Sequence, residues 1–172
     1  LYAKSYCRGL EEGIRGYMKL NLGSGNRPLE GYTGVDLSEK ADIVCDIRKL
    51  SFAEDNSVEE IIAIHVIEHF YKWEVQSILQ EWRRVLQPKG RIILECPNLL
   101  VACANVLDGR SDQLSMWALY GNPDLKNELH CHHWLYTPHT LMAELIKAGF
   151  RNCCHKAAEF KIPQRDMRVE AI

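Results

Sequence analysis

The sequence predicts a doubly wound α/β fold built on a mostly parallel sheet. Short apolar runs alternate with amphipathic helical patterns, and no internal repeat, low-complexity stretch or linker interrupts them. Residues 60–64 are almost continuously apolar, which is typical of a strand covered on both faces of a parallel sheet. Since 47% of the 172 residues are apolar, we expect residues 1–172 to form a single domain.

Composition narrows the classes of partner. The chain has 21 Lys plus Arg against 23 Asp plus Glu, so no large positive field attracts phosphate backbones and no nucleic-acid partner is expected. No charge-free apolar run approaches the roughly 20 residues that span a bilayer, and no basic-then-apolar segment opens the given sequence. The seven cysteines have no repeated spacing, which favours reduced thiols. We therefore expect a cytoplasmic protein without membrane insertion. The oligomeric state is left open.

The predicted elements follow in order. A weakly amphipathic helix is expected at 3–15, and strands at 17–22, 32–37, 42–45, 60–64, 91–96, 151–160 and 166–171. An amphipathic helix at 72–86 should be ended by Pro88 and Gly90. Two further helices are expected, one at 111–120 with Ser111 as N-cap and Gly121 just past its end, and one starting at Pro138 after the N-cap Thr137 and ending before Gly149.

Three consecutive strand ends carry groups suited to a nucleoside. In doubly wound sheets, ligands bind beyond the carboxyl ends of the strands. Gly23-Ser24-Gly25 follows the first strand, where glycine lets a ligand approach the backbone. Asp36 ends the second strand and could accept hydrogen bonds from ribose hydroxyls, while Asp46 and the amide of Ile47 could contact adenine. Each feature taken alone could also be an ordinary turn or a solvated acid.

The first crossover is short. Only nine residues, Gly23 to Gly31, separate the first two strands, whereas a parallel connection normally needs about a dozen or more. The helix of this crossover must therefore be rudimentary. Pro28 also stands where the third glycine of a dinucleotide-binding motif belongs, which argues against a nicotinamide or flavin enzyme.

Ordered motifs give a specific resemblance. Their order and spacing across residues 19–97 resemble class I S-adenosylmethionine-dependent methyltransferases, and the carrying segments are 20–25, 34–37, 46–47, 65–69 and 85–90. The chain is most similar to small bacterial members of the type 11 kind, often linked to glycan or polysaccharide synthesis, through the later segments 132–138 and 165–170. The resemblance implies a seven-stranded Rossmann-like sheet with helices on both faces and an antiparallel C-terminal strand.

The resemblance also implies the cofactor and its binding residues. S-adenosylmethionine would lie with its methionine part between Gly23 and Gly25, its ribose on Asp36, its adenine on Asp46 and Ile47, and its sulfonium beside His65. The full implied set is Asn21, Gly23, Ser24, Gly25, Asp36, Leu37, Asp46, Ile47 and His65. The methyl group would go to an oxygen or nitrogen of a small-molecule or glycan-linked acceptor. The alternative is a catalytically silent S-adenosylmethionine-binding module that acts as a partner or regulator.

Two histidine-rich segments could suggest a metal. His65-Val66-Ile67-Glu68-His69 matches a zinc peptidase pattern that requires a helix, but His65 ends a predicted strand. The four adjacent residues His130 to His133 rarely give tetrahedral geometry unaided. No metal site is therefore expected.

A hydroxyl acceptor needs a base, which a neutral histidine can supply near pH 7. The candidate catalytic residues are His65, Glu68, His69 and His133, with His132 a further possible base; each could equally be an ordinary polar or capping residue. The aromatic residues between the fifth strand and the last helix could form an acceptor wall or a separate hydrophobic cluster, and they are Trp117, Tyr120, Trp134 and Tyr136.

Overall fold

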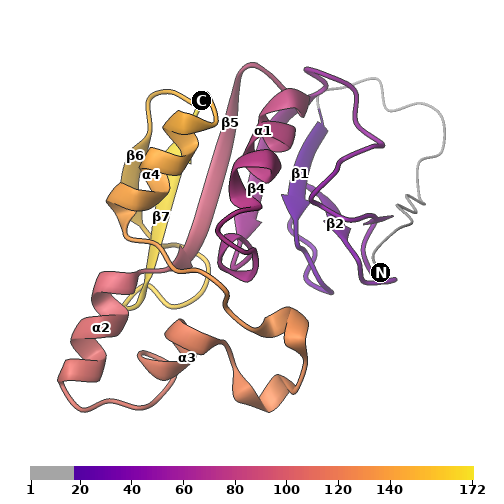
Figure 1. The fold of residues 1–172 in the computed structure, drawn as a ribbon. Helices are drawn as coiled ribbons and strands as arrows, with labels where there is room; N and C mark the ends of the chain where they lie inside the picture. The colour runs from indigo at the N-terminus through magenta and orange to yellow at the C-terminus, as the bar shows by residue number, and fades with distance from the viewer. Residues whose placement is uncertain (1–17) are drawn as a thin grey trace.

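A seven-stranded mixed sheet organises the chain. The computed structural model describes residues 18–172, so the helix predicted at 3–15 lies outside the described residues (Figure 1). The strand order is β3-β2-β1-β4-β5-β7-β6. Neighbouring strands from β3 to β5 pair in parallel, whereas β7 pairs antiparallel with β5 and with β6. The strands are β1 Met18–Leu22, β2 Thr33–Asp36, β3 Ile43–Val44, β4 Val58–Ile64, β5 Leu86–Pro97, β6 Cys154–Ala157 and β7 Asp166–Ala171. The predicted sheet is confirmed.

The helices differ from the prediction in several places. They are η1 Ile67–His69, α1 Val75–Val85, α2 Leu99–Leu107, α3 Met116–Tyr120, η2 Pro123–Leu125, η3 Glu128–His130 and α4 Pro138–Lys147, where η marks a short 3-10 turn. Helix α4 is as predicted, because the Thr137 side chain accepts a hydrogen bond from the Thr140 amide and Pro138 opens the helix.

Two helix boundaries require correction, and one helix was missed. Helix α3 has Ser115 rather than Ser111 as its N-cap residue, although Gly121 does follow its end with a φ of +94°. Pro88 and Gly90 do not end α1, because the chain turns from helix to strand at Leu86 and both residues lie within β5. Helix α2 was not predicted, since its sequence is apolar almost all round and shows no amphipathic period.

The first crossover has no helix. The chain between β1 and β2 consists of turns, and the amides of Gly23 and Ser24 both donate to the carbonyl of Val35, at 2.8 and 3.4 Å. The connection therefore folds back directly onto the next strand. The prediction of a rudimentary crossover is confirmed.

The sheet has one apolar face and one face on which charged residues pair, here called the charged face. Helices α1 and α4 lie side by side over the apolar face, where Ile61 and Leu94 belong to the core (Figure 1). On the charged face Glu60 pairs with Arg91 and, 2.7 Å apart, Arg168 pairs with Glu170. The buried Ile62 and Ile93 lie on the same face. Buried charges are tolerated there because they are paired.

Two substitutions to phenylalanine should have opposite effects on stability. Tyr136 is fully buried, and its hydroxyl has no hydrogen-bond partner among residues 18–172, so Tyr136→Phe should leave the free energy of unfolding unchanged or raise it by up to about 1 kcal/mol. The Trp82 indole N–H donates to the Ile47 carbonyl at 2.7 Å. Trp82→Phe should therefore cost about 2–3 kcal/mol in urea unfolding. A larger loss for Tyr136→Phe than for Trp82→Phe would contradict this account.

Candidate functional site

The loop after β1 packs directly on the loop after β4. Gly23 and Gly25 have φ values of +70° and +57°, in the left-handed region that favours glycine. A Cβ on Gly23 would lie 2.4 Å from Cγ2 of Val66, so the two loops touch at this point. The buried Ser24 hydroxyl has no hydrogen-bond partner within the described chain, and the Asn21 side chain donates to the Arg27 carbonyl at 3.4 Å. The structure thus leaves one buried polar atom of this loop without a hydrogen bond.

Asp36 is fixed at the end of β2. One carboxylate oxygen accepts from the Gly25 amide at 2.9 Å, and the other accepts from the Ser38 amide at 2.8 Å. A carboxylate has about four acceptor positions, so further donors can still be accommodated. The next residue, Leu37, is an apolar side chain that is 56% exposed. A carboxylate beside an open apolar surface suits a ribose joined to a base.

Asp46 has a partner that sequence reasoning missed. Its carboxylate receives hydrogen bonds from Nε and Nη2 of Arg48, the latter at 2.7 Å. Burial raises the pKa of Asp46, but the hydrogen bonds from Arg48 outweigh burial and lower it. The carbonyl of Ile47 is held by the Trp82 side chain. The position of this turn is therefore set by contacts within the protein.

His65 lies between two carboxylates. Its φ of +55° turns the chain sharply at the end of β4. Nε2 lies 2.7 Å from Oδ2 of Asp166, and Nδ1 lies 3.2 Å from Oε1 of Glu68 without hydrogen-bond geometry. Burial lowers the pKa of His65, but the contacts with Asp166 and Glu68 outweigh burial, so that the pKa is raised overall. With both ring nitrogens facing carboxylates, His65 is better placed to position its neighbours than to accept a proton.

The partner of His65 comes from the antiparallel strand. Because β7 runs opposite to β5, its first residue, Asp166, lies at the same edge as the last residues of the parallel strands. Arg165 donates to Asp166 at 2.6 Å and to the Gln113 carbonyl at 2.9 Å. Sequence reasoning gave Asp166 no role, although the reversal of the final strand was the signal that could have found it.

Glu95 is a second acid that sequence reasoning missed. Its buried carboxylate at the end of β5 accepts from the backbone amides of residues 159–161, with the shortest contact, to Phe160, at 2.8 Å. The fully buried acid thereby orders the segment between β6 and β7. Its role is to hold the loop that leads into Asp166.

Glu68, His69 and His132 form a cluster on η1 and the segment before α4. The Glu68 side chain is 1% exposed, and Nε2 of His132 lies 3.9 Å from its Oε1. The rings of His69 and His132 meet edge to face with centroids 4.9 Å apart. Burial raises the pKa of Glu68, but the surrounding histidines outweigh burial and lower it to about 2. Burial also lowers the pKa of His132.

His133 is placed differently from the other predicted catalytic residues. Its ring stacks on Tyr71 at 4.1 Å between centroids, and Tyr71 stacks on Trp73 at 4.5 Å. Its backbone amide donates to the Glu68 carbonyl at 2.8 Å. The fold thus brings His65, Glu68 and His69 together and puts the His133 ring in an aromatic stack.

The aromatic residues predicted for an acceptor wall separate into two groups. Tyr136 is fully buried and belongs to the core, so it cannot contribute a wall. Tyr120 is 65% exposed and Trp134 is 45% exposed. The exposed stack of Tyr71, Trp73 and His133, which sequence reasoning did not group, lies beside the Glu68 cluster. Tyr71 is its middle ring, so the free ring faces are those of Trp73 and His133.

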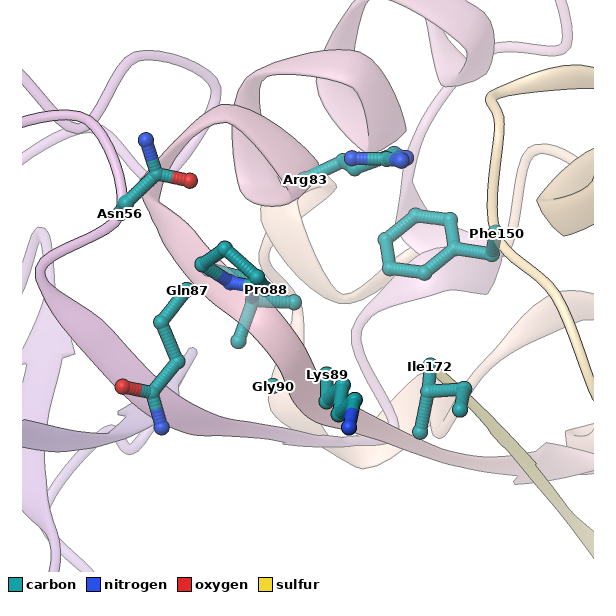
Figure 2. A pocket seen from close by; sticks show the side chains of 9 residues that line it. Asn56, Arg83, Gln87, Pro88, Lys89, Gly90, Phe150 and Ile172 are labelled. Atoms are coloured by element: carbon teal, nitrogen blue, oxygen red, sulfur yellow. The ribbon is translucent and has the colours of Figure 1, made fainter.

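The cavity in Figure 2 lies away from these groups. It is lined by residues from the end of α1, the first half of β5 and the C-terminus, including Arg83, Pro88 and Phe150. These segments are at the amino ends of the parallel strands β4 and β5. The cavity is therefore at the opposite edge of the sheet from Asp36, His65 and Glu68.

Comparisons with known proteins agree with this geometry. Residues 18–94 match the family described as a methyltransferase domain. A SAM-dependent methyltransferase from Archaeoglobus fulgidus superposes with a TM-score of 0.63 and 17% identity, over 92% of this chain and 87% of that chain. A SAM-dependent methyltransferase from Thermotoga maritima, described as a possible histamine N-methyltransferase, has a TM-score of 0.64 and 16% identity, over 92% of this chain and 83% of that chain. Another from Mesorhizobium loti has a TM-score of 0.61 and 18% identity, over 94% of this chain and 93% of that chain. A comparison with curated proteins found no match.

The strand order places the chain among Rossmann-like α/β proteins. Together with the match of residues 18–94 to the methyltransferase domain family, this fold makes the chain similar to class I S-adenosylmethionine-dependent methyltransferases. No helix within residues 18–172 has the length and apolar character needed to cross a membrane.

The contact between Gly23 and Val66 predicts a difference between two glycines. Gly31 has a φ of +80° with open space where a Cβ would lie, so Gly31→Ala should cost only the left-handed penalty of about 1–2 kcal/mol. Gly23→Ala has a similar backbone penalty and must also displace Val66, which adds about 1–3 kcal/mol. Urea unfolding of the two variants tests this. Equal losses would show that the two loops do not press on one another.

Proposed function

We propose that the enzyme transfers a methyl group from S-adenosylmethionine to an oxygen or nitrogen of a small-molecule or glycan-linked acceptor, and not to nucleic acid. The observation that carries this proposal is the meeting of two sets of groups at one edge of the sheet. The nucleoside-type groups follow β1, β2 and β3, and the carboxylate–histidine cluster follows β4 directly beside them, through the contact of Gly23 with Val66.

The residues after the first three strands fit the cofactor. The unpartnered Ser24 hydroxyl, the backbone of Gly23 and Gly25 and the side chain of Asn21 would hold the methionine part. Asp36 would accept the ribose hydroxyls with its remaining acceptor positions, and the exposed Leu37 would pack on the base. Asp46 and Ile47 would contact adenine at the next strand end. When bound, S-adenosylmethionine supplies a methyl group activated by a sulfonium.

The protein's own task is to position the acceptor and to manage its proton. His65 lies between Glu68 and Asp166, and His69 and His132 lie beside Glu68 as proton acceptors, with Nε2 of His132 3.9 Å from Oε1 of Glu68. The exposed stack of Tyr71, Trp73 and His133 supports a sugar-bearing acceptor, because carbohydrate rings pack on aromatic faces.

The proposal also covers the domain organisation and the cellular compartment. We treat residues 1–172 as one catalytic domain acting in the cytoplasm. Among the described residues, Cys96, Cys103, Cys131, Cys153 and Cys154 carry free thiols, which a reducing compartment would preserve.

Removing the Asp36 carboxylate should weaken cofactor binding. Asp36→Ala should raise the Kd for S-adenosylmethionine at least about 10-fold in isothermal titration calorimetry, because hydrogen bonds to a charged group contribute about 1.5–3 kcal/mol. Asp112→Ala is the control, since Asp112 also accepts from a backbone amide, that of Leu114 at 2.9 Å, on the segment between α2 and α3. Equal affinity in all three proteins would remove Asp36 from the cofactor site.

Breaking the aromatic stack should affect the acceptor alone. Release of S-adenosylhomocysteine in the presence of glycosides, small alcohols and amines would first identify an acceptor. Tyr71→Ala should then raise the KM for a glycoside about 3- to 10-fold and leave the Kd for S-adenosylmethionine unchanged, whereas Tyr71→Phe should behave like the wild type. A glycoside KM that does not respond to Tyr71→Ala would contradict the glycan-linked part of the proposal.

A further inference from the structure

Three side chains from two distant segments form a potential metal site. Glu68 and His69 lie on η1, and His132 lies on the segment that follows η3. One ligand atom of each residue lies within 4.8 Å of those of the other two. The set is a carboxylate and two imidazoles, which are ligands that first-row divalent transition metals prefer.

Both imidazoles are oriented for coordination through Nε2. Nδ1 of His69 lies 3.0 Å from the Cys131 carbonyl oxygen, and Nδ1 of His132 lies 2.8 Å from the Ala118 carbonyl oxygen. A carbonyl oxygen can only accept a hydrogen bond, so Nδ1 carries the hydrogen in each ring. The lone pair of each neutral ring is therefore on Nε2. Metal-binding histidines are usually held in this way, with the other nitrogen donating to a carbonyl or carboxylate.

The carboxylate of Glu68 provides a second, independent observation. It is fully buried, and neither of its oxygens has a hydrogen bond from any group within residues 18–172. The nearest ring nitrogen, Nδ1 of His65, is 3.2 Å away but lacks hydrogen-bond geometry. Leaving a buried carboxylate without donors is costly, and a cation between Glu68 and the two Nε2 atoms would remove that cost.

We propose that Glu68, His69 and His132 bind a divalent transition metal of the Zn²⁺ class. This set differs from the peptidase-like pair His65 and His69, because Nε2 of His65 already contacts Asp166. Zinc ligands at about 2.0–2.1 Å lie about 3.4 Å apart in a tetrahedron, so the groups must close by roughly 1 Å. His69 is only partly buried, which allows this adjustment.

The site leaves coordination positions open. Three protein ligands are typical of catalytic zinc, with the fourth position taken by water or substrate. Resting on the proposed function, we assign the open position to the hydroxyl oxygen of an acceptor. The metal would favour the deprotonated oxygen, with the proton released to solvent, and His69 and His132 would then act as ligands rather than as proton acceptors. The acceptor class that follows is an alcohol or sugar hydroxyl rather than an amine.

Direct metal binding tests the proposal without any acceptor. Chelator-treated protein comprising residues 1–172 should bind one Zn²⁺ in isothermal titration calorimetry, and His69→Ala and His132→Ala should each raise the Kd about 100-fold or more. The matched control is His130→Ala, because His130 is adjacent in sequence and its ring is 6.3 Å from that of His69, yet it is outside the set. Thermal unfolding confirms that each variant is folded, and Glu68→Gln offers a further variant that keeps the side-chain size.

The absorption spectrum of bound Co²⁺ distinguishes imidazole and carboxylate ligands from thiolate ligands. Co²⁺ bound to two imidazoles and a carboxylate should give weak visible bands without the intense near-ultraviolet charge-transfer band of thiolate ligation, and Cys131→Ser should leave the spectrum unchanged. No stoichiometric binding, an unchanged Kd in both histidine variants, or a thiolate spectrum would each overturn the metal site. A separate titration with S-adenosylmethionine distinguishes the two proposals, because cofactor binding without zinc binding refutes only the metal site.

Discussion

The contacts of the buried Glu68 hold together the part of the structure that we propose for the acceptor. Its carbonyl oxygen accepts the amides of His133 and Trp134, at 2.8 and 3.2 Å, which joins the turn after β4 to a segment far along the chain. Its carboxylate faces three histidines, His65, His69 and His132. The backbone contacts set the position of the later segment, and the side chain collects the imidazoles. One residue therefore holds both the scaffold and the chemical groups of this region.

The sheet explains why these groups can meet. Parallel strands end at a common edge, so the turns after β1, β2, β3 and β4 are neighbours even where the sequence separates them. The antiparallel β7 adds its first residues to the same edge, which brings Asp166 to His65. The rest of β7 serves stability instead, because Arg168 and Glu170 pair on the charged face while Met167 and Val169 enter the core.

The parts of the site that could be predicted are those whose geometry is local. The spacing of Gly23, Gly25 and Asp36 follows from a strand, a tight turn and a second strand, and β7 was predicted at its observed bounds. Longer-range features could not be read in this way. The pairing of His132 with Glu68 depends on how the segment between β5 and α4 folds back, and Tyr136 gives no local sign that its ring enters the core.

The two halves of the site are held by different kinds of contact, and this difference bears on specificity. The half that we propose for the nucleoside depends on backbone amides, a glycine turn and the acids Asp36 and Asp46, all supplied by short connections between adjacent strands. These connections tolerate few substitutions, because Val66 fills the space that a side chain on Gly23 would need. The acceptor half depends on side chains such as Tyr71 and His132, and part of it lies on a long segment of short helices and turns between β5 and α4. A segment of this kind can change its sequence without disturbing the sheet, so acceptor choice can vary while the cofactor half is retained.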